Sequence, residues 1–143
     1  MIQAMTILQF IAPLKYPRMW CAQFTADDDG SKKLVVQAGA SGTIVDAMAL
    51  SSNDLTTPYA VQFYINDGTN DFLFGTVELL VAAGAQVAAP GVDVLRSGMF
   101  GGSPLDGGPY LRLGPGFSIK FRSTTLVAAG KTLTCIAQGG DYP

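Results

Sequence analysis

The feature of this sequence that most constrains its fold is a series of short runs in which apolar residues alternate with polar or small ones. The clearest run is Tyr59–Asn66, where Tyr59, Val61, Phe63 and Ile65 occupy every second position. Successive side chains of a β-strand point to opposite faces of a sheet, so this period of two predicts a strand with one buried face. We therefore expect a chain built from strands.

A second run repeats the pattern with charge on one side. Phe117, Ile119 and Phe121 alternate with polar and cationic residues, Lys120 and Arg122 among them. This arrangement predicts a strand whose aromatic side faces the core and whose cations face water.

Similar runs follow one another from about residue 32 onward, separated by clusters of Gly, Pro, Asn and Asp that are typical of tight turns. The further strands that we expect are Lys33–Ala38, Thr43–Leu50, Asp71–Val81, Gly91–Arg96, Tyr110–Leu113 and Lys131–Gln138. About eight strands in all predict an all-β protein, a jelly-roll-like β-sandwich spanning residues 31–143.

Residues 1–30 differ from the rest of the chain. They carry scattered bulky apolar residues and two prolines, Pro13 and Pro17, whose spacing opposes a helix. We interpret this segment as an extended N-terminal arm that docks on a neighbouring subunit or on its own sandwich. The alternative is a first strand and loop of the same sandwich. The residues of the arm that we expect to contact a partner are Phe10, Leu14, Tyr16 and Trp20.

The segment Ser97–Gly108 (SGMFGGSPLDGG) is a long Gly-rich connection, and long loops in compact domains are often functional. It is the second candidate for partner contact, through Met99, Phe100 and Leu105.

The composition favours a protein that forms surfaces with other subunits. Charged residues make up 14% of the chain, against about 25% in a typical soluble domain, while 48% is apolar. Apolar surface beyond a few hundred Å² usually marks an interface, so we expect a homo-oligomer or a larger assembly. The alternative is a monomer with a neutral, Gly- and Thr-rich surface.

The charge and the N-terminal sequence argue against two classes of partner. A net charge of −2 gives no basic field for nucleic acid or for an anionic membrane. The first residues show neither a basic start before an apolar stretch nor a long spanning run, so we predict no signal peptide and no membrane helix.

The residue types argue against catalysis and against a cofactor. The chain has no histidine, which removes the commonest general base and the usual zinc ligand sets. The acidic clusters Asp27–Asp29 and Asn66–Asp71 lack the EF-hand ligand spacing, and we interpret them as turns rather than metal sites. We predict no enzyme activity, no catalytic residues, no cofactor and no metal.

Asp46 and the two cysteines can each be interpreted in two ways from the sequence. Asp46 falls in an apolar alternation, so either it faces inward or the strand carries a bulge there. Cys21 and Cys135 form no metal-binding spacing, and without a secretion signal we expect two reduced thiols rather than a disulfide.

The chain from about Leu34 to its end resembles the small β-sandwich accessory proteins of tailed-bacteriophage virions, the capsid decoration or cement type. The segments that carry the resemblance are Tyr59–Asp67 (YAVQFYIND), Asp106–Gly116 (DGGPYLRLGPG) and Gly130–Tyr142 (GKTLTCIAQGGDY). These are strand and turn patterns, not a catalytic signature.

The resemblance implies a specific role. Proteins of this type assemble as trimers or dimers, with a trimer favoured here, over the lattice of the major capsid protein and bridge neighbouring capsomers. It implies a place on the outer capsid surface of the virion after synthesis in the bacterial host cytoplasm, with no cofactor and no active residues. The alternatives are a tail, adaptor or receptor-binding component of the same particle, and a carbohydrate-binding or hydrolytic domain.

Overall fold

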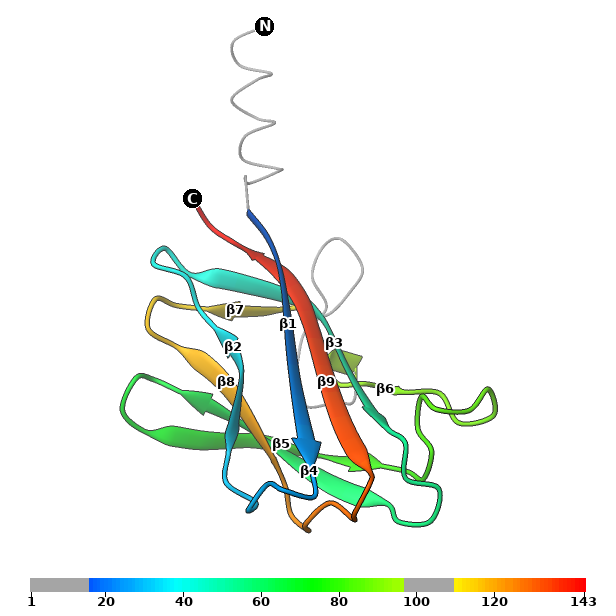
Figure 1. Cartoon of the computed structure of the whole chain (residues 1–143). Helices are drawn as coiled ribbons and strands as arrows, with labels where there is room; N and C mark the ends of the chain where they lie inside the picture. Colours follow the sequence, from blue (N-terminus) through cyan, green and yellow to red (C-terminus); the bar gives the residue numbers. More distant parts are fainter. Residues whose placement is uncertain (1–15, 97–109) are drawn as a thin grey trace, which may run out of the picture.

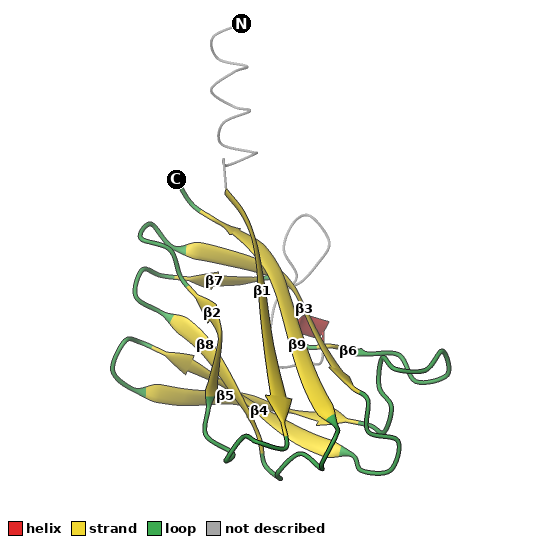
Figure 2. Cartoon of the chain, viewed as in Figure 1, coloured by secondary structure: helices red, strands yellow, loops and turns green. Residues whose placement is uncertain are grey.

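The computed structural model describes residues 16–96 and 110–143, which form two antiparallel sheets packed face to face (Figures 1 and 2). The first sheet has the order β1-β9-β3-β6, with β7 also paired to β3, and the second has the order β2-β8-β4-β5. The predicted all-β sandwich is confirmed. Its strands are β1 (Tyr16–Thr25), β2 (Lys33–Gln37), β3 (Thr43–Ser52), β4 (Tyr59–Asn66), β5 (Asp71–Leu79), β6 (Val92–Asp93), β7 (Leu111–Leu113), β8 (Ser118–Ser123) and β9 (Thr132–Asp141).

Strands with a clean alternation were predicted best. The observed β4 has the predicted bounds, with Tyr59, Val61 and Phe63 at most 2% exposed, whereas Ile65 near its end is partly exposed. The segment expected at Gly91–Arg96 contains only the two-residue strand β6.

The boundary expected at residue 30 is wrong for the described part of the arm. Residues Tyr16–Thr25 are the strand β1, which pairs with β9 without interruption from Tyr16 opposite Asp141 to Thr25 opposite Thr132. Figure 1 shows the two strands side by side although they come from opposite ends of the chain. The alternative of a first strand holds here, because the inward side chains of β1 complete the core.

The core joins the two sheets through three phenylalanines. Phe24 of β1 meets Phe121 of β8 edge to face, with ring centroids 4.7 Å apart. Phe121 in turn stacks on Phe63 of β4 at 5.9 Å. All three side chains are at most 2% exposed. These contacts hold β1 against the opposite sheet, and they account for the inward rows that the alternation predicted.

A buried carboxylate organises the turn between β3 and β4. Asp54, fully buried, accepts hydrogen bonds from the backbone amides of Thr56 and Thr57 and from the hydroxyl of Tyr59 at 2.7–3.0 Å. The amide of Thr56 and the Tyr59 hydroxyl hold the pKa of this carboxyl well below its usual range. The turn therefore depends on Asp54 remaining ionised.

A bulge in β3 explains the position of Asp46. The register with β9 shifts between Val45 and Ala47, which leaves Asp46 exposed while Val45 and Met48 both face the core. An inward Asp46 is therefore ruled out, and the alternative of a bulge is confirmed.

The two cysteines are free thiols, as expected. Cys21 is exposed, whereas Cys135 is buried on the neighbouring strand. Burial raises the pKa of the Cys135 thiol to about 12.

Candidate functional site

The outward side chains of β1, β9 and β3 form an uncharged patch on the outer face of the first sheet, bordered by Asp93 of β6, which lies opposite Ala49. Because β9 lies between β1 and β3, the outward residues of the three strands fall into rows across the sheet. The central row is Cys21, Ile136 and Ala49, with Met19, Gln138 and Ala47 on one side of it and Gln23, Thr134 and Ser51 on the other. We call these nine residues the neutral face.

Several members of the neutral face are open to solvent. Met19 is 64% exposed and Ile136 is 43% exposed. Ala47 and Ala49 are also exposed, and their small side chains project little from the sheet. A shallow hollow of about 410 Å³ lies at one end of the face, where Met19 and Gln138 meet the charged residues Arg18 and Asp46. Covering the nine residues of the neutral face with a partner costs little desolvation, because none of the nine carries a charge.

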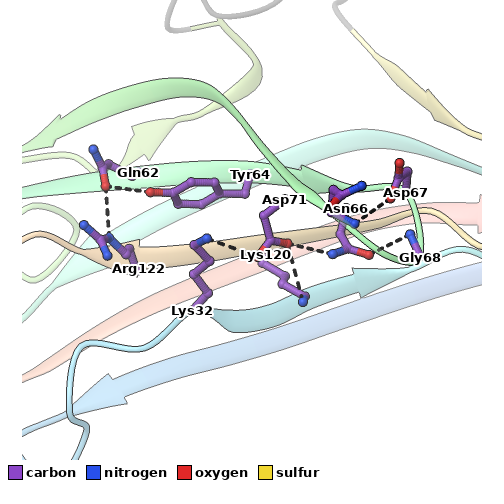
Figure 3. Close-up of polar contacts among 10 residues, drawn as sticks. Lys32, Gln62, Tyr64, Asn66, Asp67, Gly68, Asp71, Lys120 and Arg122 are labelled. Carbon is purple, nitrogen blue, oxygen red and sulfur yellow. Dashed lines mark hydrogen bonds and ion pairs between the residues drawn. The ribbon is translucent and has the colours of Figure 1, made fainter.

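The outer face of the second sheet has the opposite character, with a connected set of polar and charged side chains (Figure 3). Asp71 at the start of β5 accepts a hydrogen bond from Asn66 at 2.7 Å and forms ion pairs with Lys32 at 3.1 Å and Lys120 at 3.5 Å. The Asn66 hydrogen bond, followed by that of Lys32, lowers the pKa of Asp71. This carboxylate therefore ties three segments of the chain together.

The same polar set continues along β4 and β8. The side-chain oxygen of Gln62 accepts hydrogen bonds from Arg122 at 3.0 Å and from the Tyr64 hydroxyl at 2.8 Å. We call the seven residues Lys32, Gln62, Tyr64, Asn66, Asp71, Lys120 and Arg122 the polar network. It contains three cations and one carboxylate, which keeps this face hydrated.

The polar network does not present an open aromatic ring. The ring of Tyr64 has the Lys32 ammonium 4.2 Å from its centroid, and the residue is only 9% exposed. A sugar that stacks on an aromatic side chain needs one face of the ring free, so the geometry of Tyr64 does not favour the carbohydrate-binding alternative.

The predicted partner-contacting residues fall into three groups. Tyr16 is 63% exposed at the start of β1, as a contact residue requires. Trp20 is only 9% exposed and packs in the core with Arg18 over its ring, so its assignment to a sticky arm is wrong. The others, Phe10, Leu14, Met99, Phe100 and Leu105, lie outside the described residues, and their contacts stay a prediction.

The sequence contained a partial signal for the neutral face. In β9, Leu133, Cys135 and Ala137 face inward while the residues between them are uncharged, a pattern visible in the run TLTCIAQ. The pairing that places Met19 and Ala47 on either side of Gln138 was not visible, because the three positions are far apart along the chain.

The acidic clusters act as turns in the structure. Asp28 accepts from the Thr25 amide and pairs with Lys33, while Asp67 accepts from the amides of Thr69 and Asn70. Within residues 16–96 and 110–143, no group of three or more Cys, Asp or Glu side chains is arranged to hold a metal ion. The same residues include no helix long and apolar enough to cross a membrane.

The fold is thus a β-sandwich with the uncharged neutral face on one sheet and the polar network on the other. A scan against protein-family models finds no matching family. A search of the curated proteins likewise finds no match.

Proposed function

We propose that this protein is a structural subunit of a tailed-phage virion, a capsid decoration protein that binds the major capsid protein on the outer surface of the head and bridges neighbouring capsomers. The observation that carries the proposal is the neutral face. The centres of protein interfaces are depleted of charge, and the nine residues around Ile136 carry none, with the nearest carboxylate of β6, Asp93, at the border beside Ala49.

The difference between the two outer faces supports a single orientation on the shell. The neutral face covers the capsid lattice, while the polar network on the other side of the sandwich stays in water. Burying Lys32, Lys120 and Arg122 against a shell would require stripping water from three cations, of which only the two lysines have a carboxylate, Asp71, as a partner in this network.

On a symmetric shell, each individual contact can also have a lower affinity. When several copies are joined in a homo-oligomer, the second and later contacts become intramolecular, and modest individual affinities suffice. The low charge content of 14% fits a protein whose surface is shared with copies of itself and with a shell.

A matched pair of substitutions tests the neutral face. Ile136→Lys places a charge at its centre, whereas Leu34→Lys places the same charge on the opposite sheet at a site of similar exposure, 43% against 49%. Leu34 lies opposite Lys120, so its side chain belongs to the charged face. The measurement is binding of the purified variants to phage heads that lack the protein.

We expect Ile136→Lys to weaken binding by roughly tenfold or more and Leu34→Lys to bind like the parent protein. Circular dichroism and thermal unfolding of both variants establish that they are folded. Equal binding by the two variants would remove the neutral face from the interface. Electron microscopy of complete particles decides the location, because density confined to the neck or tail would assign the protein to those structures instead of the head.

A further inference from the structure

Strand β1 lies at the edge of its sheet, so every second residue of β1 directs its backbone N–H and C=O groups away from β9. In an antiparallel pair, alternate residues of a strand direct both their N–H and C=O groups toward the partner strand. The carbonyl of Gln23 accepts the Lys33 ammonium at 2.6 Å, and the amide of Thr25 donates to Asp28 at 2.7 Å. Neither Lys33 nor Asp28 lies on β9, so the odd-numbered residues of β1 point away from the sheet.

Among residues 16–96 and 110–143, the outward backbone groups of β1 have hydrogen-bond partners at one end of the strand and none at the other. The carbonyl of Thr25 also accepts the Asp28 amide at 3.1 Å, so Gln23 and Thr25 together keep only the Gln23 amide free. Toward the start of the strand, the free groups are the carbonyl of Pro17 and both groups of Met19 and Cys21. No other described residue hydrogen-bonds to them.

Strand β1 has few of the features that usually prevent an edge strand from pairing with another chain. The register of β1 with β9 runs for ten residues without a bulge. The one cation of the strand, Arg18, reaches across to Asp141 on β9 at 2.6 Å instead of covering the edge. A long, regular edge of this kind is a template for another strand.

We propose that β1 pairs antiparallel with β1 of a second copy of this chain, about a two-fold axis at Trp20. In this register Met19 of one copy lies opposite Cys21 of the other, and the two residues exchange hydrogen bonds in both directions. Pro17, which has no N–H, lies opposite Gln23, whose carbonyl Lys33 already holds. The free Gln23 amide then meets the free Pro17 carbonyl, so every free group of the edge finds a partner.

The neighbouring two-fold registers leave groups unpaired. An axis at Met19 places Pro17 opposite Cys21, whose carbonyl then receives no donor. An axis at Cys21 places Pro17 opposite Thr25, whose amide Asp28 already occupies. The match at Trp20 therefore argues for a second copy as the occupant, because it arises from the sequence of β1 paired with itself.

The side chains are compatible with this register. Arg18 lies opposite Ala22, so no like charges meet across the axis. The outward residues Met19 and Cys21 of both copies lie side by side, which joins the two neutral faces into one larger uncharged surface. The contact is isologous and predicts a dimer, one of the two assemblies that the resemblance implies, instead of the favoured trimer. It does not depend on which particle the protein binds.

The test is the mass of the full chain in solution, measured by light scattering over a wide range of concentration, for the parent and two variants at one position. Met19→Pro removes an outward N–H that β9 does not use, and proline is tolerated on the free side of an edge strand. Met19→Val keeps the N–H and changes only the side chain. The parent should have twice the 15.0 kDa mass of one chain.

We expect Met19→Pro to weaken the dimer by roughly tenfold or more, while Met19→Val remains dimeric. In the dimer the two Cys21 residues are diagonal neighbours about 7–8 Å apart, so a bifunctional thiol reagent of that length should join the copies. A parent protein with the mass of one chain at every concentration overturns the proposal. A dimer that persists in Met19→Pro, or that Met19→Val also abolishes, overturns it as well, because the contact then lies elsewhere or runs through side chains.

Discussion

Replacing Phe24 by alanine tests whether β1 belongs to the core. Phe24 is 2% exposed, and its ring lies edge to face against Phe121 of the opposite sheet at 4.7 Å. Removing a buried phenylalanine costs about 3–5 kcal/mol in unfolding free energy, because transfer energy is lost and a cavity is left. Domains of this size are stable by about 5–15 kcal/mol, so Phe24→Ala should remove a large share of the total.

The assay is equilibrium unfolding in urea, followed by circular dichroism and by the fluorescence of Trp20, the only tryptophan of the chain. The free energy of unfolding falls by about 1–3 kcal/mol per molar urea in small proteins, so a loss of about 3–5 kcal/mol should lower the midpoint by about 1–5 M. Phe72→Ala is the matched control, because Phe72 is 54% exposed on β5, and we expect it to cost less than about 1 kcal/mol.

A double-mutant cycle isolates the contact between the sheets. The variants Phe24→Ala and Phe121→Ala should be coupled by about 0.5–1.5 kcal/mol, the size of an aromatic pair. If Phe24→Ala costs no more than the exposed control, residues 16–25 do not belong to the core, and an arm that docks elsewhere is the better interpretation.

Three further predictions concern a carboxylate, the thiols and a glycine. The pKa of Asp54 is lowered in the folded state, so its stabilising contribution is complete above the ordinary aspartate pKa of 3.8 and is lost as pH falls through the folded value. Asp54→Asn should therefore lower the urea midpoint at pH 7 but change it less in acid, and a constant difference across pH would contradict this. A thiol reagent at neutral pH should label Cys21 alone in the folded protein, since Cys135 is buried with a pKa of about 12, and mass spectrometry showing early double labelling would contradict the assignment. Gly139→Ala should cost about 1–3 kcal/mol in urea unfolding, because a Cβ there would meet the backbone of Ile44 on β3, and an unchanged midpoint would show that the close β9–β3 pairing is wrong.

How well each strand was predicted depended on how local its signal was. Tyr59–Asn66 was found with its full extent because alternation and the turn at its end are properties of neighbouring residues. The described part of the arm was misassigned because Pro17 and the irregular apolar pattern of β1 suggested a separate segment. Its pairing with β9 depends on residues more than a hundred positions away.

The candidate surfaces were less accessible to sequence reasoning. The charged outer side of β8 was predicted, since Lys120 and Arg122 alternate with the buried Ile119 and Phe121 in one short run, whereas Phe117, also expected to face the core, is 37% exposed. Asp46 had two interpretations, and only the register of β3 with β9 in the structure identified the bulge. Trp20 was assigned to a contact surface on its size alone, whereas its burial depends on the opposite sheet.

The sequence by itself therefore determined the class of this protein: strands with one apolar side, joined by turns, that close into a sandwich with little charge to cover it. The tertiary structure alone decided which strands are neighbours. It placed Met19, Gln138 and Ala47 in one row and left β1 at an edge. The physical reason is that alternation is set by the local geometry of the strand, whereas register between distant strands is set by the packing of the whole core.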